Sequence, residues 1–99
     1  MPTRFEWDEK KNRGNRAKHG IGFEEAKAIF DGPVLTAPDQ RQDYGEERSI
    51  SYGQLGRLVV VVVVHTSRGE RIRLISARKA NRGERQAYYE YLQETTYRN

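Results

Sequence analysis

The stretch that decides the fold is "RLVVVVVVHTSRGERIRLISARKANRGER", residues 57–85. Six consecutive valines precede a histidine, and six arginines follow between residues 68 and 85. An uninterrupted valine run is typical of a central strand that is buried on both faces, because such a strand need not alternate apolar and polar residues. The sequence therefore predicts a buried strand over 57–66, with many cations directly after it.

Further strands are predicted on both sides of the valine run. Alternating apolar residues predict a strand over 47–54, and a turn at 67–70 leads into a strand over 71–78. A short strand at 34–36 would add a fourth. The short connections favour an antiparallel sheet of three to four strands, and "FEWD" (5–8) is expected to be a short strand or an extended segment leading into it.

Helices are predicted at both ends of the chain. Asp8 as N-cap and Gly20 as a left-handed stop bound a weak first helix, which has almost no apolar face. A better helix is predicted over 22–33, and its apolar face consists of Phe23, Ala26, Ile29 and Phe30. The last helix begins at Asn81, with Glu84 three residues further on as in a capping box.

Length and composition bound the class of protein. The 99 residues fit one domain, 1–99, of α+β class, with N-terminal helices, an antiparallel sheet and a C-terminal helix. The absence of cysteine excludes disulfides, thiolate catalysis and cysteine-based zinc sites. Because no segment resembles a signal peptide or is long enough to span a bilayer, we expect a cytoplasmic protein.

The charge is unevenly distributed. The formal net charge is +4, and the excess of cations lies in two clusters, 10–18 and 57–85. Basic clusters attract polyanions, so RNA, DNA and an acidic protein are all candidate partners. The alternative is a solvated surface that serves only solubility.

The register of the hairpin at 67–70 decides which side chains share a face. With a two- or four-residue loop, His65 pairs with Ile72 and lies on the face opposite Arg71 and Arg73. The residues that would share its face are Ile72, Leu74 and Ser76. With a three-residue loop, His65 lies across from Arg71 instead. Both registers place the two arginines on one face, about 6.6 Å apart along the strand, a spacing that suits phosphate.

A cation-rich chain without a metal-ligand pattern fits one reaction. RNA is cleaved when its own 2′-hydroxyl attacks the adjacent phosphate, and the protein need supply only a base or acid and cations. The two histidines show no ligand spacing, so we expect no metal and no other cofactor. The expected catalytic residues are His65, Arg73, Arg78 and His19. The expected RNA-phosphate ligands are Lys18, Arg71, Lys79, Arg82 and Arg85.

Two alternatives stay open. A lone histidine is more often structural than catalytic, and neighbouring arginines are expected to lower the pKa of His65 by repelling its imidazolium form. The chain could also be a basic α+β module that only docks a protein or a nucleic acid. RNA cleavage in EDTA would separate the enzyme from the module.

Two long segments resemble the BrnT toxin family: "FEWDEKKNRGNRAKHGIGFEEAKAIF" (5–30) and "GRLVVVVVVHTSRGERIRLISARKANRGERQAYYE" (56–90). The marks are "KHG" before "FEEA", "VVHT" before "RG", and "IRLISARKA" before a helix that contains Arg and Glu. The resemblance implies a RelE-like α+β fold and a ribonuclease toxin of a type II toxin–antitoxin system that arrests translation.

The resemblance also implies partners. A BrnA-like ribbon-helix-helix antitoxin would neutralise the toxin, and the complex would bind promoter DNA only through the antitoxin. We expect a dimer or a heterotetramer with the antitoxin, and no contact with a membrane. The valines would then anchor the central strand, and the cations would form an RNA-binding face that the antitoxin covers.

Overall fold

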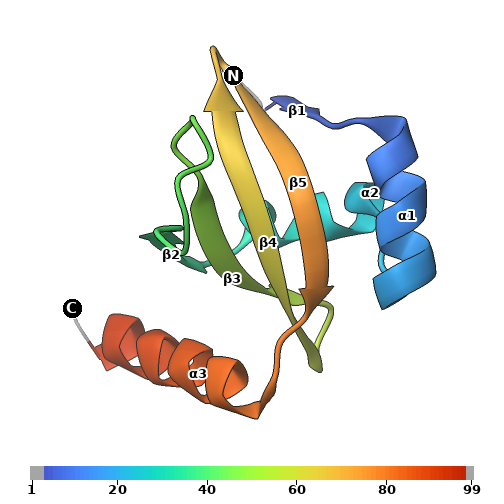
Figure 1. The fold of residues 1–99 in the computed structure, drawn as a ribbon. Helices are drawn as coiled ribbons and strands as arrows, with labels where there is room; N and C mark the ends of the chain where they lie inside the picture. The colour runs from blue at the N-terminus through green and yellow to red at the C-terminus, as the bar shows by residue number, and fades with distance from the viewer. Residues whose placement is uncertain (1–3, 98–99) are drawn as a thin grey trace.

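The valine run forms the middle strand of the sheet, as predicted, and the sheet has five strands. The structure is a computed structural model that describes residues 4–97. The elements in chain order are β1 (Arg4–Glu6), α1 (Glu9–His19), α2 (Phe23–Ala26), the 3₁₀ helix η1 (Lys27–Asp31), β2 (Val34–Pro38), β3 (Ser49–Leu55), β4 (Val59–Arg68), β5 (Arg71–Lys79) and α3 (Arg82–Tyr97). Figure 1 shows this sheet with α1 beside β5 and α3 at its lower end.

The α+β class is confirmed, but the sheet is larger than predicted. Its order is β1-β5-β4-β3-β2, and β2 to β5 form the expected antiparallel meander. The fifth strand is β1, which pairs with β5 in parallel, with Phe5 beside Ile72. The prediction of three to four antiparallel strands was therefore too small. This pairing joins segments far apart in the chain, and no local turn pattern can announce it.

Alternate valines of β4 face two separate clusters of buried side chains. On one face, Val61 and Val63 pack against Phe23 and Ile29. We call this the α2 face, because α2 and η1 cover it. The other face, which we call the α3 face, carries the second cluster, and its buried members are Val60, Val62, Ala80 and Tyr88. Successive side chains of a strand point to opposite sides. Because both faces of β4 are buried, an apolar residue is needed at every position of the run.

Helix α1 is held by amide side chains in place of an apolar face. Asp8 accepts hydrogen bonds from two backbone N–H groups, and Gly20 ends the helix at φ 75°, so both predicted boundaries are confirmed. The buried Asn15 donates from Nδ2 to the carbonyls of Ile21 (2.9 Å) and Ala77 (2.8 Å). Its Oδ1 accepts from the N–H of Ala77 (3.1 Å). The weak apolar pattern of this helix reflects that mode of attachment.

The predicted helix over 22–33 is only partly correct. The chain forms four α-helical residues in α2 and then tightens into η1. Phe23, Ala26 and Ile29 are buried, as the pattern predicts. Ile29 lies directly over β3 at Gly53, where a Cβ atom would come within 2.6 Å of the Ile29 Cβ. This glycine lets the short helical segment approach the sheet closely.

The hairpin between β4 and β5 has a two-residue loop, which the first sequence alternative allowed, but not the pairing that was expected for it. Arg68 pairs with Arg71, so the loop has two residues, and Gly69 has a positive φ of 61°. His65 consequently pairs with Leu74, and the expected pairing with Ile72 was wrong by two residues. An even shift keeps His65 on the face that it was expected to share with Leu74 and Ile72.

A β-bulge interrupts this ladder beside His65. Val64 pairs with Ser76 while the next residue of β4, His65, pairs with Leu74, so Ile75 has no partner on β4. The extra residue inverts the facing of all later β5 side chains. Ser76 therefore leaves the face of His65, against the expectation, and lies with Val64 on the α3 face.

Candidate nucleic-acid interface

The bulge gathers the arginines of β5 on one side of the sheet. Arg71 and Arg73 come before Ile75, whereas Ser76 and Arg78 come after it. In a regular strand these two pairs would point in opposite directions. Because of the one unpaired residue, all four lie on the α3 face. This face therefore carries a line of arginines along β5 that the regular alternation would not have produced.

The line extends across the neighbouring strands at the hairpin end. Arg71 pairs with Arg68 of β4 on one side and with Arg4 of β1 on the other. Paired residues of adjacent strands point to the same face, so the three arginines form a row. Glu6 partly neutralises this region, with 2.7 Å to Arg73 and 3.9 Å to Arg71.

A cleft of about 270 Å³ lies at the other end of the line, bounded by residues of the sheet, by Arg41 of the loop between β2 and β3, and by Glu84 at the start of α3. Its apolar lining consists of Ile50, Val62 and Val64. Its polar lining consists of Arg41, Tyr52, Ser76, Arg78 and Glu84. An apolar floor with a few convergent polar groups is the usual character of a binding site.

Arg78 is fixed in this cleft by two parallel bonds to Glu84. Nη1 donates to Oε1 and Nη2 donates to Oε2, each over 2.8 Å. The bonds from Arg78 lower the pKa of Glu84, although partial burial acts in the opposite direction. The same carboxylate accepts from the backbone N–H of Asn81, whose side chain accepts from the Glu84 N–H, so the predicted capping box is confirmed. Glu84 is thus an ionised anchor and a weak base.

His65 lies on the opposite face of the sheet from these arginines. Its Nε2 is hydrogen-bonded to Ser51 Oγ (2.7 Å), and its ring meets the ring of Phe30 edge-on at 5.1 Å. Ser51 is fully buried and shares a second hydrogen bond with Thr36 (2.7 Å). The pKa of His65 is lowered, as expected, but burial causes the shift and neighbouring arginines do not. This is the environment of a packed, neutral imidazole.

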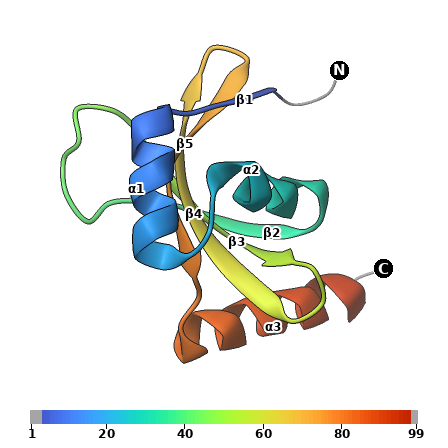
Figure 2. The same cartoon turned by 90° about the vertical axis from the view of Figure 1, so that its right-hand side faces the viewer.

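The remaining predicted residues divide between the two sides. Lys18 and His19 end α1, which lies beside β5 and away from α3 (Figures 1 and 2). Lys79 pairs with Val61 of the α2 face. Arg82 and Arg85 lie in the first turns of α3, where Arg85 donates to the carbonyl of Ala80 (3.1 Å). The structure brings together the arginines of β5, and it does not bring either histidine to them.

Of the polar residues that line the cleft, sequence reasoning named only Arg78 as a site residue, and it gave no site role to Arg41, Tyr52, Ser76 or Glu84. Arg41 reaches the cleft from the loop between β2 and β3, and Tyr52 reaches it from β3. The alternation of β3 correctly grouped Tyr52 with Ile50, but nothing in the pattern linked them to Arg78. Across residues 4–97, no three His, Asp or Glu side chains are grouped so that they could hold a metal ion. Within the same range, no helix is long and apolar enough to cross a membrane.

Comparisons with known proteins agree with this architecture. A solved structure of the ribonuclease toxin BrnT from Brucella abortus matches with a TM-score of 0.65 and 24% sequence identity, over 82% of this chain and 100% of that one. At that identity the match establishes the shared fold. No curated protein sequence matches the chain. A family profile described as "Ribonuclease toxin, BrnT, of type II toxin-antitoxin system" matches residues 7–84. Since that match spans most of the chain, this protein belongs to the BrnT family of ribonuclease toxins.

Proposed function

We propose that this chain is a metal-independent endoribonuclease whose RNA substrate lies along the α3 face, with the scissile phosphate in the cleft at Arg78. The observation that carries the proposal is the bulge at Ile75, which aligns Arg71, Arg73 and Arg78 on one face. A row of cations that leads into a cleft suits a single-stranded polyanion.

The chemistry follows from the RNA itself. The 2′-hydroxyl gives its proton to a water molecule as its oxygen attacks the adjacent phosphorus, the bond from phosphorus to the 5′-oxygen breaks, and the products carry a 2′,3′-cyclic phosphate and a 5′-hydroxyl. Arg78 offers a guanidinium charge, held in place by Glu84, to the charge that develops on the phosphoryl oxygens. Since the nucleophile belongs to the substrate, no metal ion is needed to generate it.

The leaving 5′-oxygen needs a proton donor, and Tyr52 lines the cleft. The hydroxyl of Tyr52 is the group that we assign to protonate the leaving 5′-oxygen. Glu84 has a lowered pKa and is a weak base, so we assign it the positioning of Arg78. His65 and His19 have no place at this phosphate, because His65 faces the other side of the sheet and His19 ends α1. In this scheme most of the acceleration of RNA cleavage comes from electrostatic stabilisation of the charge on the phosphoryl oxygens.

Type II toxins have an antitoxin partner, and we propose that the partner here is a BrnA-like ribbon-helix-helix protein. Its toxin-binding segment would cover the α3 face and exclude RNA from the arginines. Cleavage of messenger RNA by the free toxin would arrest translation. A reading frame for a small ribbon-helix-helix protein next to the toxin gene would support this pairing. Purified complex should leave RNA intact under conditions in which free toxin cleaves it.

The test uses three substrates of one sequence in EDTA: RNA, DNA, and RNA with a single 2′-deoxy nucleotide at the main cleavage site. We expect cleavage of the RNA only, loss of that one cut in the substituted RNA, and cyclic-phosphate product ends. Parallel reactions contain purified ribosomes, so that an enzyme that cleaves RNA only on the ribosome is also detected. If RNA is bound but stays intact in both settings, the enzyme is refuted in favour of the binding module. Cleavage that stops on adding EDTA would refute metal independence.

A further inference from the structure

We propose that Arg41 is a second phosphate-binding residue of the cleft and that Asp39 is the residue that positions it. The inference rests on the proposed function and deepens it, because it names a substrate-binding group outside the sheet. Arg41 belongs to the loop between β2 and β3, yet it lines the same cleft as Arg78.

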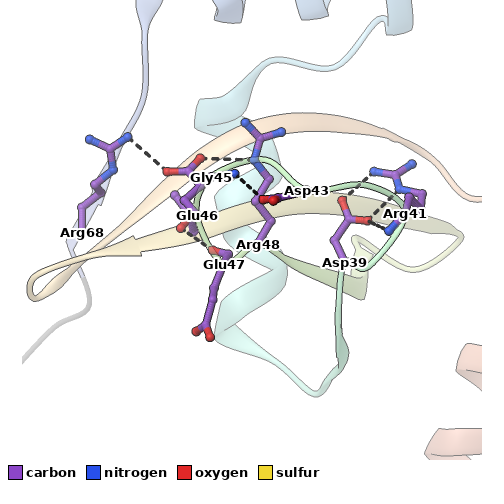
Figure 3. Close-up of polar contacts among 9 residues, drawn as sticks. Asp39, Arg41, Asp43, Gly45, Glu46, Glu47, Arg48 and Arg68 are labelled. Atoms are coloured by element: carbon purple, nitrogen blue, oxygen red, sulfur yellow. Dashed lines mark hydrogen bonds and ion pairs between the residues drawn. The ribbon is translucent and has the colours of Figure 1, made fainter.

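Asp39 grips Arg41 with both carboxylate oxygens (Figure 3). Arg41 Nε donates to Oδ1 and Nη2 donates to Oδ2, each over 2.8 Å. The backbone N–H of Arg41 also donates to Oδ1, over 3.3 Å. A planar guanidinium that is held at one edge has its orientation set before an anion arrives.

The two side chains differ sharply in exposure, and the difference fits their roles. The side chain of Asp39 has no exposed area, whereas that of Arg41 is 62% exposed. The backbone N–H of Asp39 donates to the carbonyl of Arg48 (2.8 Å), which closes the base of the loop. The bonds from Arg41 lower the pKa of Asp39 to about 2, so its carboxylate is ionised at neutral pH. A buried anion thus holds an exposed cation over the cleft.

Arg41 and Arg78 form a pair of similarly anchored forks. Each guanidinium makes two 2.8 Å bonds to one carboxylate, Asp39 for Arg41 and Glu84 for Arg78. Repulsion from Arg41 acts against the charged form of Arg78. Two cations held in one cleft repel each other until an anion lies between them, and a phosphodiester has two unesterified oxygens to offer. Anchored donors of this kind need no rearrangement when the charge arrives.

The same loop contains a matched control residue. Arg48 is the last residue of the loop; its side chain bonds to Glu46 (3.2 Å, Figure 3) and lies over the ring of Tyr44 (4.0 Å). It does not line the cleft. Replacement of Arg48 by Gln removes one charge from the loop, as replacement of Arg41 does, but leaves the cleft unchanged.

The experiment measures steady-state RNA cleavage, RNA binding against salt, and thermal unfolding for Arg41→Gln, Arg41→Lys, Asp39→Asn and Arg48→Gln. For Arg41→Gln we expect kcat/KM to fall about 10- to 100-fold, mainly through KM, with a normal unfolding temperature. The slope of log affinity against log salt should fall by about 0.7. Arg41→Lys should recover only part of the loss, because an ammonium keeps the charge but loses the fork. Asp39→Asn should raise KM in the same way as Arg41→Gln but by a smaller factor. Arg48→Gln should cleave RNA as the wild type does.

The outcomes distinguish failure of this inference from failure of the proposed ribonuclease function. If the wild type leaves RNA intact, the proposed function fails, and this inference fails with it. If the wild type cleaves RNA and Arg78→Ala is impaired, but Arg41→Gln has a normal KM and salt slope, Arg41 is not a ligand and the enzyme stands. If Asp39→Asn does not fold, the role of the anchored guanidinium is decided by Arg41→Lys. A KM of Arg41→Lys equal to that of the wild type would show that the charge is sufficient and would overturn the role given to Asp39.

Discussion

The two faces of the sheet share the strand β4 and differ in what covers them. The α2 face is closed by helical segments, and its central side chains, such as Phe23, Val61 and Leu74, are almost inaccessible. On the α3 face, α3 lies at the lower end of the sheet (Figure 2) and packs against it through Tyr88, Tyr91 and Leu92, while the line of arginines runs along β5. One face therefore supplies most of the stability, and the other has room for a ligand. Strand alternation lets a single run of valines serve both.

The largest effect should come from the closed face. Replacement of Phe23 by Ala removes a fully buried ring that also meets the ring of Trp7 edge-on at 6.1 Å. We expect the free energy of unfolding to fall by about 3–5 kcal/mol, measured by urea titration. Leu58, which is 86% exposed, is the control, and its replacement by Ala should change stability by less than about 0.5 kcal/mol. Similar losses for the two variants would break the comparison between the faces.

The next effect belongs to the open face. Replacement of Arg78 by Ala should lower the rate of RNA cleavage about 10²- to 10³-fold, since a positioned cation is lost where the phosphate carries its charge. Stability should change little, because the capping contacts between Glu84 and Asn81 remain. Arg57→Ala, which removes a cation from the exposed turn between β3 and β4, is the control and should cleave normally. An unchanged rate for Arg78→Ala would remove the cleft from the mechanism.

The smallest effect tests which face His65 serves. His65→Gln weakens the contacts to Ser51 and Phe30, so we expect about 1 kcal/mol less stability and normal cleavage by the folded protein. Burial lowers the folded-state pKa of His65 below its ordinary 6.5. The unfolded chain therefore takes up the proton first as the pH falls. The stability that the neutral His65 side chain provides is therefore complete above pH 6.5 and is lost progressively below it.

Thermal unfolding of His65→Gln and wild type at several pH values checks this sign. The difference between the two unfolding temperatures should shrink as the solution becomes more acidic. A loss of 10²-fold or more in rate, with stability unchanged, would instead return His65 to the catalytic role that the sequence suggested. That result would also mean that substrate reaches the α2 face.

The sequence by itself determined the features that depend on neighbours a few residues apart. The valine run predicted the central strand, Asp8 and Gly20 predicted the limits of α1, and Asn81 with Glu84 predicted the capping box. Each of these rests on side-chain periodicity or on a hydrogen bond within one turn, so the local chain carries the whole signal. The same reasoning placed Arg71 and Arg73 together on one face, which is correct.

Only the tertiary structure decided which residues meet at the candidate site. The unpaired Ile75 reverses the facing of Ser76 and Arg78, and the parallel pairing of β1 brings Glu6 to Arg73. Arg41 reaches the cleft from a polar loop whose path depends on the buried carboxylate of Asp39. Register, bulges and loop paths result from packing between segments that are distant in the chain. A one-residue shift costs little in local propensity, yet it moves every later side chain to the other face.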